Sequence, residues 1–504
     1  MTHITSVNPA TGESVELVAE ETPRAEVLEL SERAASIARD YANRPLSWRA
    51  KLLRAMADEL ETDAHNLVEL AGRETALTQA RLIGELRRAA FQFRFFAEVV
   101  LDASFLQASI DHAKDSPMGP LPDLRRVRVP LGPVGVFGSS NFPFAFSVPG
   151  GDTASALAAG CPVVIKAHPS HPATSLAAFQ ALARAAHSLD APAGLLALVY
   201  GVDAGVALVD APPIRAVGFT GSVSAGQSLW RRANDRPTPI PFFGELGSAN
   251  PLVITVAAAA AQAQSIGTGI AASMSLGVGQ FCTKPGLLFV PANANGDTVV
   301  ASLVGELQKL PTLIMLSDAI AAQFRSGVSG YEDAPGVAHT MSSPEGEGAH
   351  VGAQLFEVSA ENFRDPSASH LRDECFGPLA LVVRYHDRDE LASALAATGP
   401  SLTFSIFRGS PDHDEAWLVE FAQSRAGRVI IDGYPTGVAV SWSMEHGGPW
   451  PATTAPSTTS VGAASIERWL RPVTYQDVPD GLLPEALRDQ NPQGVPQRVD
   501  GVLR

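Results

Sequence analysis

From about residue 121 onward, short runs of β-branched residues alternate with alanine-rich segments, and this alternation restricts the fold more than any other feature. The run "CPVVIKAHP", for example, is followed by "PATSLAAFQALARAAHSL". Strands that alternate with helices of roughly 10 to 15 residues form βαβ units, whose parallel strands lie between helices on both faces. The pattern therefore predicts an α/β fold with doubly wound parallel sheets.

The alternation occurs twice, which predicts two such sheets. One set of strand patterns covers residues 121–245, and another extends from "NPLVITV" (250–256) to "GRVIIDG" (427–433). Before them, from about 25 to 100, apolar residues recur three or four positions apart and predict a helical region. With 504 residues, of which 45% are hydrophobic, the chain has enough apolar side chains for two large cores.

The composition argues against several classes of function. The chain has 37 basic and 53 acidic residues, a net charge of −16, which disfavours nucleic acid or an anionic membrane as a partner. Its three cysteines (161, 282 and 375) lack the close spacing of a metal site, so we expect neither a bound metal nor a disulfide framework. We find no signal-peptide pattern and no apolar run of 18 residues, so we expect a cytoplasmic protein that does not span a membrane.

One cysteine lies in a segment rich in glycine, "GQFCTKPG" at 279–286. Glycines on both sides allow the backbone to turn sharply and to present the Cys282 thiol to a cleft. This environment suits a nucleophile. A free cysteine is also commonly a small buried apolar residue, and the segment alone leaves both interpretations open.

Two other segments supply groups that a thiol nucleophile needs, namely a base and hydrogen-bond donors for an oxyanion. In "PFFGELGSANP", Glu245 lies between small residues and can turn toward a cleft as a general base. In "GSSNFPFAFSVPG", Asn141 follows a strand and a turn, and its amide is a candidate oxyanion donor. The alternatives are a surface charge for Glu245 and a turn or helix cap for Asn141.

Two segments are suited to binding a dinucleotide. "VGFTGSVSAG" predicts a strand, a turn and a helix, with Gly221 and Gly226 spaced so that helix amides can face a pyrophosphate. This pattern is weaker than the usual glycine-rich fingerprint. Lys166, at the end of the strand "CPVVIK", is a candidate contact for a ribose or a phosphate, although a solvated lysine is the simpler interpretation.

Together, these segments resemble the aldehyde dehydrogenase family from "VNPATGE" to the C-terminal tail. Several weak motifs in one order make a specific signal: Asn141, Lys166, "FTGS" (219–222), Glu245, Cys282 and "ECFGP" (374–378). The resemblance implies two α/β domains and a small β element that bridges subunits. The expected parts are a dinucleotide-binding domain (1–112 and 133–246), a catalytic domain (247–440) and a bridging element (113–132 with 441–504).

The resemblance also implies a role for each matching residue. Cys282 would form a thiohemiacetal and then a thioester with an aldehyde, and Asn141 with the Cys282 backbone amide would hold the oxyanion. Glu245 would activate the water that releases a carboxylic acid. Glu374 and Phe376 match positions near the nicotinamide ribose and ring. The expected contacts at the other end of the cofactor are Lys166, Gly221, Ser222 and Gly226.

The sequence departs from the family pattern beside Lys166. The family usually has a glutamate three residues after this lysine, where it repels a 2′-phosphate, and Pro169 stands there instead. His168 and Ser170 are candidate donors to such a phosphate. We therefore expect NADP or NAD as the cofactor, with NADP or dual use favoured.

The branch that this chain resembles most contains bacterial α-ketoglutaric semialdehyde (2,5-dioxopentanoate) dehydrogenases and an NADP-dependent fatty aldehyde dehydrogenase. The similar features are "KAHPSHP", "GGDTASALAAGCPVV", "HGGPWPATT" and the long step from Glu245 to Cys282. We expect oxidation of 2,5-dioxopentanoate. The alternatives are medium- or long-chain fatty aldehydes, acyl transfer to coenzyme A, and a non-catalytic structural or binding protein.

Two further residues are candidates for the substrate pocket, and the bridging element predicts an assembly. Arg94 belongs to the helical segment "GELRRAAFQFRFFAEVV", which offers cations and aromatic rings, although ordinary amphipathic packing also explains it. His446, in "MEHGGP", is either a pocket residue or a structural histidine. We expect a homodimer or homotetramer.

Overall fold

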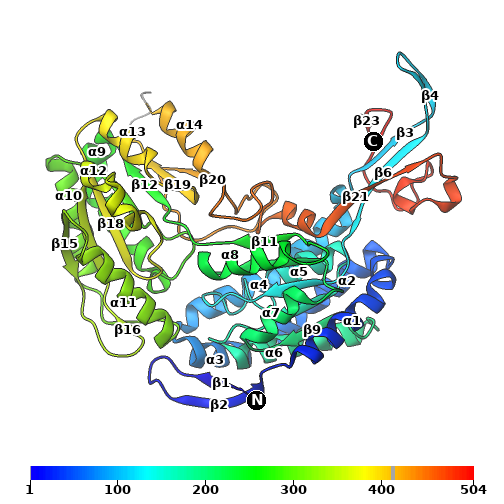
Figure 1. Ribbon diagram of the computed structural model, residues 1–504, viewed down its shortest axis with the longest axis horizontal. Helices are drawn as coiled ribbons and strands as arrows, with labels where there is room; N and C mark the ends of the chain where they lie inside the picture. The colour runs from blue at the N-terminus through cyan, green and yellow to red at the C-terminus, as the bar shows by residue number, and fades with distance from the viewer. Residues whose placement is uncertain (1, 410–414) are drawn as a thin grey trace.

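The computed structural model describes residues 2–409 and 415–504, which form two α/β bodies and a projecting β arm (Figure 1). The sheet of the first body has five parallel strands in the order β11-β10-β7-β8-β9. In chain order they are β7 (Val134–Phe137), β8 (Val163–Lys166), β9 (Leu196–Val199), β10 (Ala216–Thr220) and β11 (Phe242–Glu245). The strand and helix alternation therefore gives the parallel sheet that the sequence predicts.

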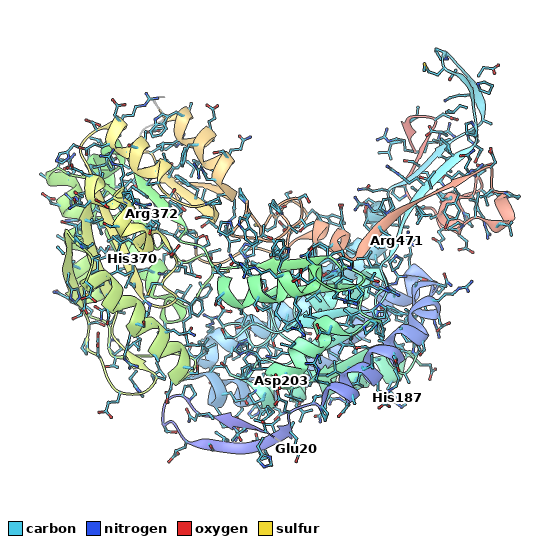
Figure 2. All side chains as sticks on the ribbon, in the orientation of Figure 1. Glu20, His187, Asp203, His370, Arg372 and Arg471 are labelled. Carbon is cyan, nitrogen blue, oxygen red and sulfur yellow. The ribbon has the colours of Figure 1, made fainter. Side chains whose placement is uncertain are left out.

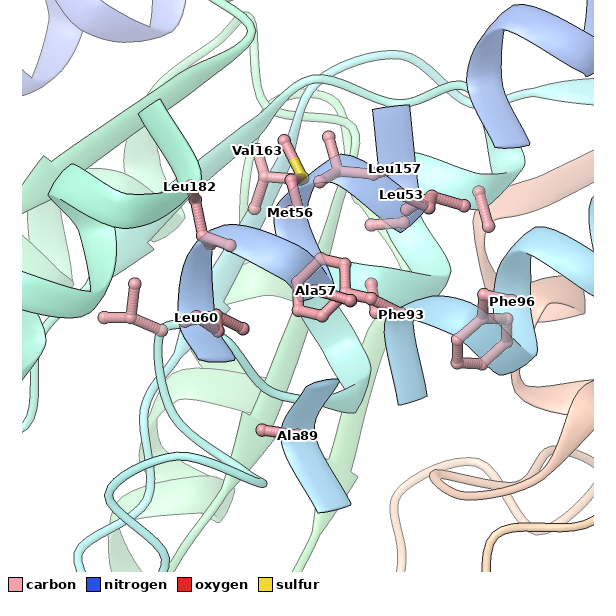
Figure 3. Close-up of a cluster of buried hydrophobic side chains, with 14 of the residues drawn as sticks. Leu53, Met56, Ala57, Leu60, Ala89, Phe93, Phe96, Leu157, Val163 and Leu182 are labelled. Atoms are coloured by element: carbon pink, nitrogen blue, oxygen red, sulfur yellow. The ribbon is translucent and has the colours of Figure 1, made fainter. Parts of the chain in front are cut away.

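Eight helices belong to the first body: α1 (Arg24–Ala42), α2 (Leu46–Thr62), α3 (Ala64–Thr75), α4 (Gln79–Asp102), α5 (Gly151–Ala159), α6 (Pro172–Ser188), α7 (Val202–Asp210) and α8 (Val223–Asn234). Helix α2 buries Leu53, Met56 and Leu60 completely, because their spacing places them on one face. They pack with Phe93 of α4 and Leu157 of α5 in one apolar cluster (Figure 3). A hairpin of β1 (His3–Val7) and β2 (Ser14–Glu20) precedes these helices.

The second body contains a seven-stranded sheet in the order β15-β17-β18-β13-β12-β19-β20, in which only the pairing of β15 with β17 is antiparallel. Its strands are β12 (Pro251–Ile254), β13 (Leu287–Pro291), β15 (Val337–Ser342), β17 (Gln354–Ser359), β18 (Leu379–Tyr385), β19 (Ser401–Phe407) and β20 (Ala426–Ile431). A short pair, β14 (Leu313–Ile314) and β16 (His350–Val351), lies apart from this sheet. The helices are α9 (Val256–Ser275), α10 (Ala294–Leu307), α11 (Asp318–Glu332), α12 (Ala360–Phe363), α13 (Arg388–Ala396) and α14 (Ala416–Arg425).

The arm is a separate sheet that extends from the first body (Figure 1). Its strands are β3 (Ala108–Asp111), β6 (Leu124–Pro130), β21 (Leu470–Gln476), β22 (Gln497–Val499) and β23 (Val502–Leu503), with a hairpin of β4 (Lys114–Ser116) and β5 (Gly119–Leu121) at one end. Arg471 of β21 lies where the arm joins the body (Figure 2). The arm thus combines residues from the first quarter and the end of the chain.

The strand register of the first sheet places several candidate residues in one row. Phe137 pairs with Lys166 on one side and with Phe219 on the other, and Thr220 pairs with Glu245. Four of these residues end their strands and Phe219 is next to the end of β10, so they lie at the carboxyl edge of the sheet. This edge is where open parallel sheets bind their ligands.

Within the described ranges, none of the helices combines the length and the apolar character that a membrane span requires.

Candidate active site

The segment that contains Cys282 is fixed by close backbone packing. It follows a short 3-10 helix (Leu276–Gly279) and precedes β13. Gly279 has a φ of 64°, and a Cβ there would lie 2.4 Å from the carbonyl oxygen of Gly377. Only glycine permits this approach without strain. On the other side, the Asn250 amide donates to the Cys282 carbonyl at 2.7 Å, so the thiol has a defined position.

The Cys282 thiol lies against a histidine and a glutamate. The distance from Cys282 Sγ to His446 Nε2 is 3.5 Å, and that from His446 Nε2 to Glu245 Oε1 is 3.0 Å. The three reactive atoms all lie within 4.8 Å of one another. The Ser460 hydroxyl donates to the second oxygen of Glu245. The structure therefore brings a nucleophile, a carboxylate base and an imidazole together.

His446 and Ser460 reach this cluster because the C-terminal segment pairs with the edge of the first sheet. The Leu246 amide donates to the carbonyl of Ala452 at 2.9 Å, and the Thr454 amide donates to the carbonyl of Gly244 at 3.0 Å. These bonds lie on either side of Glu245, which ends β11. The pairing therefore fixes the carboxylate and its two partners on one short length of backbone. Sequence analysis singled out His446 but missed Ser460, which lies in an unremarkable serine- and threonine-rich stretch.

The charges in this cluster favour a neutral thiol and an ionised carboxylate. Burial raises the pKa of Cys282 well above its usual value, and the neighbouring Glu245 raises it further, while Arg88 acts in the opposite direction. For Glu245, burial raises the pKa, but His446 and Ser460 hold it below its usual value. A thiol that attacks a carbonyl must therefore lose its proton, and the ionised Glu245 carboxylate is within reach to take it, while His446 Nε2 donates to that carboxylate.

We expect this raised pKa to appear in the chemical reactivity of Cys282. Because only the thiolate reacts, alkylation by iodoacetamide should accelerate about tenfold per pH unit while the pH is below the pKa. For the cofactor-free enzyme, the rate should still be rising at pH 9, the ordinary thiol value. Mass spectrometry of the Cys282 peptide measures this rate separately from Cys161, which is buried and whose pKa burial raises to about 11. A plateau below pH 9 would contradict the expectation.

Asn141 is held beside the cysteine segment. Its side-chain amide donates to the carbonyl of Gln280 at 2.8 Å, and its own carbonyl accepts a hydrogen bond of 2.8 Å from Arg81. A primary amide carries two N–H groups, so one remains for another acceptor. Gln280 lies two residues before Cys282, so this hydrogen bond holds the Asn141 amide close to the cysteine. The position suits the predicted oxyanion donor.

A polar stripe on α4 positions the Asn141 loop, and sequence reasoning missed it. The stripe consists of Arg81, Glu85, Arg88 and Gln92, which are spaced three or four residues apart and share one helix face. The Glu85 carboxylate accepts from the amides of Phe144 and Ala145 at 2.9 and 3.2 Å, and Gln92 donates to the Ala145 carbonyl. The detectable signal was polar residues at helical spacing in an otherwise apolar helix.

Arg94 does not join the other candidates. It follows Glu85 by nine positions, and at about 100° per residue its side chain leaves α4 on the opposite side from the stripe. There its guanidinium binds Asp58 and Glu61 of α2, each at 2.7 Å. We therefore correct the prediction: α4 does offer an arginine to the site, but this residue is Arg88.

Two groups at the carboxyl edge of the first sheet suit a phosphate or ribose. Burial lowers the pKa of Lys166, which ends β8, to about 8, while Glu21 favours its charged form. Ser222 caps α8, and its hydroxyl accepts from the Ala225 amide at 3.4 Å. The helix N-terminus adds partial positive charge.

The two glycines of this turn differ in what they do. Gly221 is exposed in the turn before α8. Gly226 is buried, and a Cβ there would lie 2.2 Å from Leu246 Cδ2. Gly226 is therefore needed for close packing of α8 against the segment that follows β11. The last glycine of a dinucleotide-binding fingerprint has the same role.

His168 is neutral rather than cationic. Burial, together with the neighbouring His171 and Lys166, holds the pKa of His168 well below its usual value. Its Nδ1 accepts from the Ser170 amide at 3.1 Å, so this part of the ring is occupied. At neutral pH the pair supplies hydrogen bonds but no added charge to a phosphate.

Glu374 lies close to the strand that ends at Glu245. A Cβ on Gly247 would lie 2.1 Å from a Glu374 oxygen, so glycine is required for this approach. Burial raises the pKa of Glu374 to about 7, while Lys284 and the Ser248 amide act against the increase. Phe376 follows, half-buried, in the same segment. A carboxylate whose charge acts on the Cys282 thiol, with a helix N-terminus and an ammonium farther along the sheet edge, fits the two ends of a dinucleotide.

Comparisons with known proteins agree with this geometry. The model of the aldehyde dehydrogenase family, so described, matches residues 1–450. The chain is 45% identical to alpha-ketoglutaric semialdehyde dehydrogenase 2 of Azospirillum brasilense over 93% of this chain and 91% of that one. It is 38% identical to alpha-ketoglutaric semialdehyde dehydrogenase of Acinetobacter baylyi, with 92% and 88% covered. The crystal structure of 3,6-anhydro-L-galactose dehydrogenase in complex with NAP has the same fold, with a TM-score of 0.80, 19% identity and coverage of 94% and 96%.

Proposed function

Since this chain belongs to the aldehyde dehydrogenase family, we propose that it oxidises 2,5-dioxopentanoate to 2-oxoglutarate with NAD(P)⁺. The observation that carries the proposal is the contact of Cys282 with His446 and Glu245, which supplies a nucleophile and its bases. The substrate is supported by two relatives at 45% and 38% identity, both named for α-ketoglutaric semialdehyde.

The first step is attack of the Cys282 sulfur on the aldehyde carbon. The thiol proton moves to the Glu245 carboxylate, which lies near the sulfur, and a thiohemiacetal forms. The second N–H of Asn141 and the backbone amide of Cys282 stabilise the negative oxygen. When bound, the nicotinamide supplies the hydride acceptor, which leaves a thioester on Cys282.

The second step is hydrolysis of this thioester by a water molecule. Glu245 takes a proton from the water, because its carboxylate is ionised and lies within reach of the acylated sulfur. His446 and Ser460 hold its two oxygens and fix its direction. The thiolate of Cys282 leaves and regains its proton. A base dedicated to water disfavours the alternative in which coenzyme A accepts the acyl group.

The cofactor proposal assigns residues to each end of NAD(P). Glu374 and Phe376 contact the nicotinamide half, and Lys166, Ser222 and the α8 N-terminus contact the adenosine half. The absence of an acid at Pro169 removes repulsion of a 2′-phosphate, and Lys166 supplies a charge, so NADP or dual use remains favoured. A neutral His168 and Ser170 contribute hydrogen bonds only.

The proposal extends to domains, assembly and location. Residues 1–112 and 133–246 form the dinucleotide-binding domain, 247–440 the catalytic domain, and 113–132 with 441–504 the bridging element. The arm supports a homodimer or homotetramer, because its edge strand β23 exposes Val502 and Leu503 by 61% and 64%. We also propose that the protein is cytoplasmic.

Steady-state kinetics with purified enzyme test the substrate. We expect kcat/KM for 2,5-dioxopentanoate to exceed that for hexanal by at least about tenfold, since a site built for a charged group penalises its absence. Decanal tests the fatty aldehyde alternative in the same assay. A higher kcat/KM for either alkyl aldehyde would refute the substrate, and product formation that requires coenzyme A would refute the hydrolytic step.

A further inference from the structure

Arg88 is a half-buried cation with unused hydrogen-bonding capacity. Its Nε and one terminal nitrogen are buried, and neither has a hydrogen-bond partner among the residues that the structure describes. A buried guanidinium is costly unless an anion or several acceptors satisfy it. The side chain is therefore suited to bind an anionic group.

Aromatic contacts place Arg88 on the wall of the active site. Its guanidinium lies 5.1 Å from the ring centre of Phe146 and 5.9 Å from that of Phe142. The Phe146 ring is 6.4 Å from the ring of His446, which in turn contacts Cys282. Burial lowers the pKa of Arg88, and the charges of Glu85, Cys282 and Glu245, in that order, act against this decrease. An anion on Arg88 is thus close to the reacting thiol.

The neighbouring acids and carbonyls make no hydrogen bond to the two buried nitrogens of Arg88, so its charge is available to a bound anion. Glu85, one turn earlier, has one oxygen engaged by backbone amides, and burial raises its pKa. The ion pair that Glu85 does make, at 3.8 Å, is with Arg81. By contrast, Arg428, which also acts on Cys282, donates to the carbonyls of Pro435 and Gly437. Arg88 therefore has two buried donors without a partner among the described residues, whereas Arg81 and Arg428 have one each.

We propose that Arg88 binds the carboxylate of an aldehyde acid whose other end is attacked by Cys282. This inference rests on the proposed function and names the group that selects the substrate. A guanidinium can hold a carboxylate through two parallel hydrogen bonds. Phe142 and Phe146 cover the carbon chain between the two ends and exclude water, which strengthens the ion pair.

The same geometry explains how fatty aldehydes are rejected. An alkyl chain in this space leaves the Arg88 guanidinium without an anion. A fatty aldehyde therefore binds less favourably than an aldehyde acid, whose carboxylate pairs with Arg88. Selectivity then depends on one cation, not on the size of the pocket.

The test compares Arg88→Met and Arg88→Lys with Arg87→Met, a control on the exposed neighbour in the same helix. Arg88→Met should lower kcat/KM for 2,5-dioxopentanoate by about 100-fold, and change kcat/KM for hexanal by less than about threefold. Arg88→Lys keeps the charge but loses the paired donors, so its loss should be intermediate. The control should match the wild type with both substrates. Equal losses with both aldehydes, or no loss with the acid, would overturn the proposal.

A second measurement separates this inference from the substrate itself. Glutarate has a carboxylate at each end and no aldehyde, so it should inhibit hexanal oxidation by the wild type competitively. Arg88→Met should weaken this inhibition about tenfold. If the wild type fails to prefer 2,5-dioxopentanoate but glutarate inhibition still depends on Arg88, the proposed substrate fails and the anion site stands. Equal inhibition of wild type and variant refutes the anion site.

Discussion

Replacing Cys282 with alanine should lower aldehyde oxidation by about 10⁴-fold or more, because no other group near the substrate can form the covalent thioester. Glu245 and His446 have lone pairs, but each is engaged in the hydrogen bond that joins them. The measurement is the rate of reduced cofactor formation at saturating aldehyde. Cofactor binding, followed by quenching of tryptophan fluorescence, should be unchanged, because alanine removes only the sulfur.

The matched control is Cys161→Ala. Cys161 is fully buried in the core of the first body, where its thiol contacts the Trp469 carbonyl at 3.5 Å. Its replacement should keep kcat within about twofold and cost about 1 kcal/mol of stability, as expected for a small cavity. Activity of the Cys282→Ala protein near the wild-type level would refute the covalent mechanism.

Replacing Glu245 with glutamine should lower turnover by about 10²- to 10⁴-fold while a first burst of reduced cofactor persists. Hydride leaves before water attacks, so the loss falls on the step after the burst. Removing the Glu245 charge also lowers the pKa of Cys282, and without the carboxylate His446 Nε2 is free to take the thiol proton in place of Glu245. Rapid mixing should show close to one reduced cofactor per active site, followed by slow hydrolysis.

A surface change, Glu61→Gln, controls for loss of a carboxylate elsewhere in the chain. It should leave both the burst and the turnover at the wild-type level, since Glu61 pairs with Arg94 on the outside of α4. If Glu245→Gln abolished the burst as well as turnover, Glu245 would be required before hydride leaves. Its main role would then be to activate the thiol.

The sequence was sufficient for the parallel sheets and for residues that lie in short motifs. Asn141 follows a strand and a turn that the sequence predicts, and small or glycine neighbours identify Cys282 and Glu245. Parallel strands have their carboxyl ends at one edge, so Lys166 and Ser222 were also expected to lie near one another. The positions of these residues can therefore be predicted from short sequence motifs and from the geometry of a parallel sheet.

The remaining features depend on contacts between distant segments, which periodicity cannot locate. Ser460 is 215 residues from Glu245 and lies in a stretch that has no motif of its own. Arg88 and Arg94 look equivalent in the sequence, since both belong to the same helix. Which face of that helix meets the Asn141 loop is decided by tertiary packing, through Glu85 and Gln92. The choice of Arg94 was wrong for this reason.

The pairing of residues 452–454 with the edge of the first sheet has a consequence for how the protein is made. A ribosome synthesises Cys282 long before His446, which follows it by 164 residues. Until this late segment emerges, Glu245 lacks the imidazole and the hydroxyl that hold its carboxylate. The nascent chain is therefore inactive toward aldehydes even when its nucleophile is already folded. The complete catalytic cluster forms only when nearly the whole chain has been translated.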